Sequence, residues 1–455
     1  MSGLRVLVTN TALDARAGSE LYVRDLTTAL LARGHTPIAY SPVLGEVARE
    51  IRVATVPVVD DLAALGSPPD VIHGHHCLET LTALLRFPGV PAISMCHGWL
   101  PWQEVPPRSP RIRRYVAVDD TCRDRLVLEH GIPQDRVRVL RNFVDLDRFR
   151  PRGPLPARPT RALVFSNAAA EHTHLPAVRE ACAHAGITVD VAGSATGRVA
   201  QAPEDVLTTY DLVFAKGRAA LEALAVGAAV VLCDAVGAGP LVTDADFDRL
   251  RALNFGIRAL STPVTAAHLA RELARYDAAD TARVSLRVRR EAGRDVVVDE
   301  LIAIYHDAIA EQAAAAQPDL VVEARAAADT LRALWGVFQQ TEAATRHHWT
   351  HAFDDERARL CADTAALRSE LERQTSAGIT LRHELDGERV RVAALTAHLA
   401  EAHGQLARMG DEFARVREEL AILNASTTVR LRDRILSTPG VRSIARFGLR
   451  VAKGV

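Results

Sequence analysis

The sequence predicts an α/β protein of two doubly wound, Rossmann-like domains followed by a long α-helical coiled coil. Three observations support this prediction. Short apolar runs alternate with helical stretches up to about residue 311, a proline-rich break divides that region, and proline is absent from 319–438, where a heptad pattern develops. Short apolar strands separated by helices are typical of a parallel sheet that helices cover on both faces.

The apolar, β-branched runs mark the expected strands. In the first half they lie at residues 4–8, 71–72, 90–95, 115–118 and 137–140, with helices expected at 20–33 and 121–130. In the second half they lie at residues 162–165, 187–191, 211–214 and 228–232, with helices expected at 177–185 and 219–226. Four prolines fall within residues 150–159, so the predicted domains are 1–150 and 151–311.

Composition excludes several classes of protein. The 55 basic and 56 acidic residues give a net charge of −1, which excludes a globally basic nucleic-acid binder. No apolar run reaches the roughly 18–20 residues of a membrane span, and the first residues lack the order of a signal peptide. The six cysteines are scattered without a CxxC pair, which argues against a zinc site or a disulfide framework. We therefore expect a cytoplasmic protein.

Residues 320–427 are predicted to form a coiled coil because apolar residues alternate at spacings of three and four. One row consists of Leu385, Val392, Leu399, Leu406, Phe413 and Leu420, and the other of Leu395, Ala402, Met409, Val416 and Leu423. A sustained heptad stripe needs a partner surface, so we expect a homo-oligomer formed through residues 353–423. A solvated single helix and a helical hairpin remain alternatives.

The segment 428–455 is a basic amphipathic tail. From residue 429 on it carries seven basic residues and one acid, interleaved with apolar side chains. Such a pattern suits an anionic membrane surface, at about 1 kcal/mol for each basic residue near the surface. A disordered tail, or one that docks on an acidic face of the same protein, is the alternative.

The first βα turn contains Gly18, which allows close backbone approach, and Ser19, which can cap the following helix. The N-terminus of that helix can attract an anion. Many α/β domains have a glycine at this turn, so the signal is weak by itself.

The order of several motifs is much more specific. These motifs are Gly18-Ser19-Glu20, Arg33-Gly34-His35, Asp70-Val71-Ile72-His73-Gly74-His75, Ile93-Ser94-Met95-Cys96-His97-Gly98, Gly131-Ile132-Pro133, Arg136-Val137-Arg138-Val139-Leu140 and Asn142-Phe143-Val144-Asp145-Leu146-Asp147-Arg148-Phe149. Over residues 4–300 or so, the chain resembles family-4-type glycosyltransferases of the GT-B fold. The resemblance implies a nucleotide-sugar donor on the C-terminal domain and an acceptor on the N-terminal one. It also suggests retention at the anomeric carbon.

A second turn, around Gly217, is expected to bind the donor diphosphate. A glycine turn that opens a helix presents free N–H groups, here including that of Ala219, and Lys216 and Arg218 add positive charge where the leaving group becomes negative. Glu222 lies one turn into the helix and matches the second glutamate of the family's paired-glutamate segment. Glu222 is therefore a candidate catalytic residue beside His97, and its place one turn into the helix suits hydrogen bonds from ribose hydroxyls.

The chain departs from the family at two places. The family's first glutamate position is Phe214, and the strand at 162–165 is followed by Ser166 and Asn167 rather than by the family's Arg and Lys. We expect these two residues and Gly193 at the donor site. Only two lysines occur in the chain, so Lys216 is a candidate for the missing diphosphate ligand, where a compact ammonium fits better than a planar guanidinium.

His97 follows an apolar strand, and in the resembling family this position faces the reaction centre. An imidazole there can orient the donor sugar or move the acceptor proton. A buried, hydrogen-bonded loop histidine is the alternative. Trp99 and Trp102 either line the acceptor cleft or pack in the fold.

We predict no metal site. The cluster of His73, His75 and His76 consists of sequence neighbours at the end of one strand and lacks a supporting carboxylate motif. The segment Asp145-Leu146-Asp147 looks like the metal-binding DxD of the other glycosyltransferase fold, but its neighbours match the family's hinge. No cofactor is expected, because the nucleotide sugar is a substrate.

The sequence is thus interpreted as a cytoplasmic glycosyltransferase that acts on a glycan or lipid-linked acceptor, in surface polysaccharide or glycolipid assembly, and touches the inner membrane face through its tail. Two other hypotheses stay open. One is a catalytically inactive GT-B module that serves as a coiled-coil scaffold, favoured by the missing Glu, Arg and Lys. The other is a nucleotide-sugar epimerase, which can share this fold.

Overall fold

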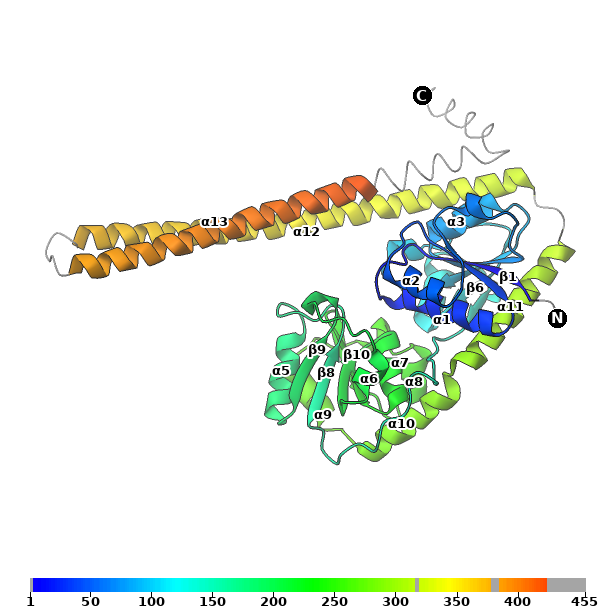
Figure 1. The fold of residues 1–455 in the computed structure, drawn as a ribbon, viewed down its shortest axis with the longest axis horizontal. Coiled ribbons are helices and arrows are strands. Elements are labelled where there is room, and N and C mark those ends of the chain that lie inside the picture. The colour runs from blue at the N-terminus through cyan, green and yellow to red at the C-terminus, as the bar shows by residue number, and fades with distance from the viewer. Residues whose placement is uncertain (1–2, 316–318, 378–383, 424–455) are drawn as a thin grey trace, which may run out of the picture. The chain divides into compact units, whose positions relative to one another are not determined.

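The structure is a computed structural model that describes residues 3–315, 319–377 and 384–423 (Figure 1). The chain divides into two compact units, Met1–Ala327 and Ala328–Val455. The first unit contains both predicted α/β domains, and the second contains most of the long C-terminal helical region. The basic tail predicted at 428–455 lies outside the described residues, so its membrane contact stays a prediction.

The first domain is built on a seven-stranded parallel sheet in the order β3-β2-β1-β4-β5-β6-β7. Its strands are β1 (Arg5–Thr9), β2 (Thr36–Tyr40), β3 (Val58–Val59), β4 (Val71–His75), β5 (Ala92–Cys96), β6 (Ile112–Ala117) and β7 (Val137–Val139). Its helices are α1 (Gly18–Ala32), α2 (Glu46–Val53), α3 (Cys77–Arg86) and α4 (Asp120–Asp124). The reversal of strand order between β1 and β4 makes this a doubly wound sheet, in which ligands bind at the carboxyl ends of the strands.

The second domain has a five-stranded sheet in the order β12-β11-β10-β8-β9, parallel except for β12. Its strands are β8 (Arg161–Phe165), β9 (Thr188–Ala192), β10 (Leu212–Ala215), β11 (Ala229–Asp234) and β12 (Gly237–Leu241). Its helices are α5 (Leu175–His184), α6 (Pro203–Leu207), α7 (Gly217–Val226), α8 (Phe247–Ala252), α9 (Ala266–Leu273) and α10 (Ala278–Glu291). Two Rossmann-like domains in one chain are the GT-B architecture, as the sequence predicts.

The helix expected at 121–130 differs from the prediction. It begins as α4, capped by Asp119, whose carboxylate accepts a hydrogen bond from the Cys122 amide at 2.7 Å. It then continues as a π-helical turn, Arg125–Glu129. The Arg125 guanidinium donates to the carbonyls of Gly98 and Pro101, at 2.6 and 3.2 Å, and so holds the loop after β5.

Helix α11 (Arg294–Ala314) extends the core of the first domain, although it follows the second domain in the chain (Figure 1). Its buried residues are Val297, Val298, Leu301, Ile304, Tyr305 and Ala308, and they join the hydrophobic core formed around β1, β4 and β5. The chain therefore crosses back after α10, and residues 294–311, placed in the second domain by the sequence, pack on the first.

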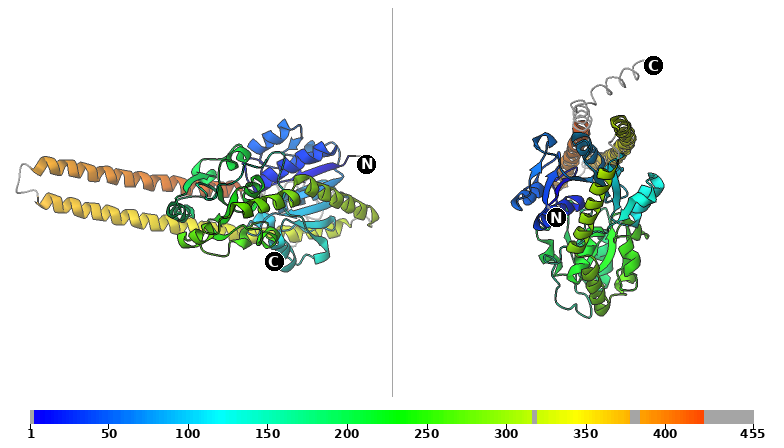
Figure 2. Two further views of the ribbon diagram at one scale, coloured as in Figure 1. Left: turned by 90° about the horizontal axis from the view of Figure 1, so that it is seen from below. Right: turned by 90° about the vertical axis from the view of Figure 1, so that its right-hand side faces the viewer.

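The predicted coiled-coil region consists of two long helices, α12 (Leu320–Ala377) and α13 (Glu384–Leu423), which lie side by side in both views (Figures 1 and 2). The heptad positions of α13 with described side chains are half-buried: Val392, Leu395, Leu399, Ala402, Leu406, Met409, Phe413, Val416 and Leu420. The rings of Phe353 and Phe413 are 5.9 Å apart. The stripe thus packs against a helix of the same chain, the hairpin alternative, while self-association stays a prediction.

Within the described residues, no helix combines the length and the apolar character that a membrane crossing requires.

Candidate active site

His97 stands at the carboxyl end of the first sheet, next to the end of β4. Its Nε2 lies 2.7 Å from Nδ1 of His75, and the two rings stack with centroids 4.7 Å apart. His75 in turn stacks on His73 at 4.6 Å, and Nδ1 of His73 is 2.5 Å from the hydroxyl of Tyr305 on α11. The three imidazoles therefore form a column that leads from the core to His97, which is half-buried.

Burial keeps these imidazoles neutral. It lowers the pKa of His73 to about 3, and it lowers the pKa values of His75 and His97 well below the usual range, assisted by the neighbouring histidines. A neutral imidazole has one donor and one acceptor nitrogen. Because Nε2 of His97 is paired with His75, Nδ1 of His97 is the ring nitrogen that can contact a substrate.

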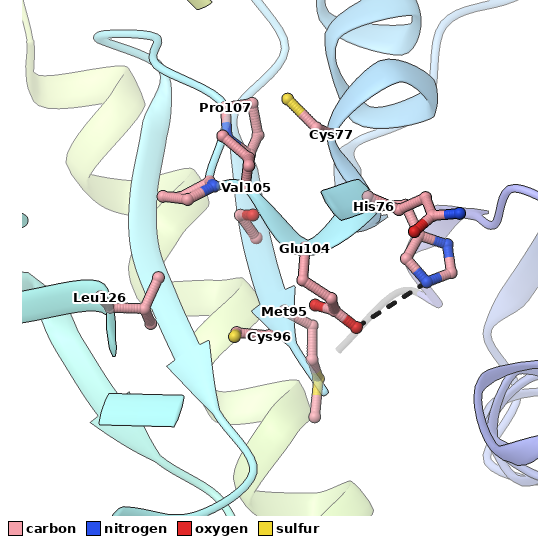
Figure 3. Close-up of a pocket in the computed structure, with 11 residues that line it drawn as sticks. His76, Cys77, Met95, Cys96, Glu104, Val105, Pro107 and Leu126 are labelled. Atoms are coloured by element: carbon pink, nitrogen blue, oxygen red, sulfur yellow. Dashed lines mark ion pairs between the residues drawn. The ribbon is translucent and has the colours of Figure 1, made fainter. Parts of the chain in front are cut away.

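A buried carboxyl group holds the backbone of His97. Glu104, in a short 3-10 turn at Trp102–Glu104, accepts a hydrogen bond from the His97 amide at 2.9 Å. It lines a narrow pocket behind the loop together with Cys96 and His76, and its carboxylate lies 3.8 Å from Nε2 of His76 (Figure 3). Burial raises the pKa of Glu104 to about 7, although the hydrogen bond from His97 opposes the shift.

The predicted diphosphate turn opens α7, as expected, but its polar groups are already engaged. Gly217 has φ of +56°, a conformation that glycine adopts readily, and its amide donates to the Phe255 carbonyl at 2.7 Å. The Lys216 ammonium forms an ion pair with Asp234 at the end of β11. Of the predicted donor amides, that of Gly217 is therefore unavailable to a ligand.

Arg218 is buried and paired twice. Its guanidinium contacts Asp25 of α1 and, through Nε at 2.7 Å, Glu222 one turn further along α7. Burial raises the pKa of Asp25, but Arg218 and Arg24 outweigh it and hold that pKa below its usual value. Burial keeps the pKa of Glu222 above its usual value despite Arg218. Glu222 is only 5% exposed, so a ribose reaches it only if this cluster rearranges.

The two halves of the predicted site come together at Arg218. Its charge lowers the pKa of His97 and opposes the burial that raises the pKa of Tyr22. The Tyr22 ring, also on α1, lies 4.9 Å from the His97 ring. The structure thus places His97 and the α7 turn around α1, at whose first residue Gly18 stands.

The loops after β8 and β9 contact each other. A Cβ atom on Gly193 would lie 1.9 Å from the Ser166 carbonyl oxygen, so only glycine permits this approach. Oδ1 of Asn167 accepts a hydrogen bond from the Ser194 amide at 3.0 Å. Ser166, Asn167 and Gly193 are therefore neighbours, while their role at a donor site stays a prediction. The Ser166 hydroxyl points to Asp234 at 3.3 Å.

The remaining sequence candidates have structural contacts. The Trp99 ring lies under the Arg258 guanidinium, 5.1 Å from its centroid, and Arg258 also pairs with Asp124 at 2.6 Å. Trp102 opens the 3-10 turn that carries Glu104. Asp145 pairs with Arg294, as suits a hinge residue. Among the residues that the structure describes, no three His, Cys, Asp or Glu side chains are grouped to hold a metal ion.

The residues of the site that were missed from the sequence include Tyr22, Asp25 and Asp234. A signal for Asp25 existed, because it interrupts the apolar stripe of α1 that continues through Leu26 and Ala29. Asp234 directly follows the apolar run of β11, where parallel strands present functional groups. Neither position reveals its partner, because both partners are distant in sequence.

Comparison with known proteins found one family model and several solved structures that are similar to this chain. Residues 16–148 match the model of Glycosyltransferase Family 4. Among solved structures, a glycosyltransferase from Rickettsia africae has 13% identity, with 67% of this chain and 99% of that chain covered and a TM-score of 0.49. Anabaena HepE in complex with UDP and glucose has 14% identity, coverage of 67% and 99%, and a TM-score of 0.48.

The lipopolysaccharide outer core galactosyltransferase WaaB has 11% identity, coverage of 68% and 99%, and a TM-score of 0.42. No curated protein is significantly similar to this chain. The family match spans the motifs from the first helix to the hinge, which is the order on which the resemblance was based. Residues 16–148 thus carry the likeness to glycosyltransferase family 4.

Proposed function

We propose that the protein transfers a sugar from a nucleotide-sugar donor to a glycan or lipid-linked acceptor. The observation that carries the proposal is the convergence of His97 from the first domain and Arg218 from the second on α1. Side chains from the two domains meet there, within a chain whose residues 16–148 match a glycosyltransferase family model.

The chemistry requires an acceptor oxygen to bond to the anomeric carbon while the bond from that carbon to the diphosphate breaks. The acceptor hydroxyl loses its proton, and the neutral imidazole of His97 is suited to accept it or to orient the sugar. Positive charge from Lys216 and Arg218 would stabilise the leaving diphosphate. The proposal includes no metal and no cofactor beyond the substrate.

The finer points of the proposal rest on the resemblance and on sequence patterns. Retention at the anomeric carbon follows the family, whereas Phe214 at the first glutamate position weighs against it. Self-association through residues 353–423 and membrane contact through 429–455 suit a lipid-anchored acceptor in surface polysaccharide or glycolipid assembly.

Deleting residues 429–455 should release the protein from anionic vesicles and leave turnover of a water-soluble acceptor intact. Continued sedimentation with the vesicles would contradict the anchor.

The scaffold hypothesis is favoured by one specific observation. Glu222 and Arg218 neutralise each other in a buried cluster, and Lys216 is neutralised by Asp234. The site in this state therefore has little excess positive charge for a diphosphate. An inactive GT-B module would have this arrangement permanently, whereas an enzyme must rearrange it on binding.

The melting temperature measured with UDP, GDP, ADP and TDP distinguishes a transferase from a scaffold. A transferase is stabilised by at least one nucleotide, because a ligand that binds only the folded state raises the melting temperature. Lys216→Ala should lose this stabilisation, and Lys453→Ala, which alters the only other lysine, should keep it. Unchanged melting temperatures with all four would favour the scaffold. Sugar transfer to a lipid extract, rather than isomerisation of the donor, would exclude the epimerase.

A further inference from the structure

Three hydrogen-bond donors converge on the carboxylate of Asp234. The Lys216 ammonium forms an ion pair with it, the Ser166 hydroxyl donates at 3.3 Å, and the Ala235 amide donates at 2.6 Å. These groups come from the carboxyl ends of β10, β8 and β11, which are neighbours in the sheet. Asp234 itself is only 5% exposed.

This donor set is chemically that of an oxyanion site. An ammonium, a hydroxyl and a backbone N–H at the carboxyl edge of a parallel sheet are the groups that bind phosphoryl oxygens. Here a carboxylate of the protein occupies them. Because its charge cancels that of Lys216, an entering phosphate meets a site that is neutral as a whole.

A buried histidine beside this cluster supports the same interpretation. His174 is 1% exposed, and neither ring nitrogen has a hydrogen-bond partner. Burial lowers its pKa, and the opposing effects of the Asp234 carboxylate and the Lys216 ammonium show that both lie within electrostatic range. Buried polar groups are normally hydrogen-bonded, so the His174 imidazole, within electrostatic range of Lys216 and Asp234, is an exception to that rule.

We propose that Asp234 is an internal substitute for a phosphoryl group: its carboxylate holds Lys216 and Ser166, and a diphosphate takes these donors from it. The inference rests on the proposed function and deepens it, because it names Asp234 as the residue that sets diphosphate affinity.

The test is calorimetric titration with inorganic pyrophosphate and with the same four nucleoside diphosphates. Asp234→Asn keeps the shape and one acceptor oxygen but removes the competing charge. It should bind pyrophosphate about tenfold more tightly than the wild type, because a like charge next to the ligand is lost. Asp205→Asn, an exposed carboxylate on α6, is the matched control and should leave the affinity unchanged.

A double-mutant comparison tests whether Asp234 and the diphosphate compete for Lys216. In a Lys216→Ala background the gain from Asp234→Asn should shrink to less than about threefold, because the contested ammonium is absent. Circular dichroism confirms that each variant is folded. If the Asn variant does not fold, Asp234→Ser, which keeps a hydroxyl for Lys216, takes its place.

The outcomes separate this inference from the proposed function. Nucleoside diphosphates that bind the wild type and the folded Asp234 variant equally would overturn the inference and leave the transferase standing. Tighter pyrophosphate binding by the variant without any sugar transfer would support the inference and count against the transferase. Absence of binding to every variant would overturn both.

Discussion

Arg218 on α7 forms a buried ion pair with Asp25 on α1, so one side chain connects the donor turn of the second domain to the helix beside His97 of the first. The guanidinium also contacts Glu222 at 2.7 Å. Two carboxylates outweigh burial and raise the pKa of Arg218, so it stays charged. Any movement of the two domains apart must break this pair.

Asp25→Asn should therefore destabilise the fold. Removing one partner of a buried ion pair leaves an uncompensated charge, which costs roughly 3–5 kcal/mol when no other partner is present. Because Glu222 still faces Arg218, we expect about 2–3 kcal/mol, measured by urea denaturation. Asp205→Asn, on the exposed face of α6, should change stability by less than about 0.5 kcal/mol. Equal effects of the two substitutions would show that the pair contributes nothing.

The histidine column predicts acid sensitivity. The folded pKa of His73, about 3, lies below the ordinary value of 6.5, so the unfolded chain takes up a proton that the folded protein refuses. The neutral imidazole therefore leaves the free energy of unfolding at its full value above pH 6.5, and this free energy declines as the pH falls toward 3. Between pH 6.5 and pH 5, His73 alone should lower the free energy of unfolding by about 2 kcal/mol.

Urea denaturation across that pH range measures the effect. His73→Phe should flatten the dependence by about that amount, although it also removes the contact with Tyr305 and lowers stability at every pH. His184→Ala, at the exposed end of α5, should leave the slope unchanged. A His73→Phe protein with the slope of the wild type would contradict a neutral, buried imidazole.

Glu104 predicts the opposite dependence. Its folded pKa of about 7 lies above the ordinary 4.5, so stability is complete below pH 4.5 and declines as the pH rises to 7. Glu104→Gln removes this decline and keeps an acceptor oxygen for the His97 amide. The free energy of unfolding of the variant, relative to that of the wild type, should rise by on the order of 3 kcal/mol between pH 4.5 and pH 8. A difference between the two proteins that does not vary with pH would rule out a buried, titrating Glu104.

Local sequence was sufficient to predict the turn at Gly217 and most of the parallel strands, although β2 and β3 were not among them. Continuous apolar runs such as that of β11 fit a two-sided buried strand, and a glycine before a helix fits φ of +56°. β12 was missed because its sequence, GAGPL, lacks β-branched residues, so its pairing with β11 comes from tertiary context. The same limit applies to α11, whose helical sequence does not reveal which domain it covers.

Residue roles in the site were less predictable than their positions. The sequence placed Lys216, Arg218 and Glu222 correctly on one turn, but treated each as open to a ligand. Their actual partners include Asp25 and Asp234, which only the fold brings near. A charge pattern along one helix cannot show that a carboxylate from another element neutralises it.

The contact between Phe353 and Phe413 gives the last prediction. Their rings, 5.9 Å apart, lie in the seam between α12 and α13. Phe413→Ala removes a half-buried aromatic side chain, which should cost the helical pair about 1–2 kcal/mol, less than the 3–5 kcal/mol of a fully buried site. The measurement is thermal unfolding followed by circular dichroism at 222 nm, with Glu412→Ala, an exposed neighbour, as the control.

The same variants test self-association. The heptad side chains are only half-buried in the hairpin, so apolar area remains for a second copy, and light scattering should show an oligomer that weakens in Phe413→Ala but not in Glu412→Ala. A monomeric wild type whose helices melt earlier in Phe413→Ala would mean that the seam is closed within one chain. That result would remove the oligomer and keep the hairpin, because the heptad stripe would then have its partner surface in α12.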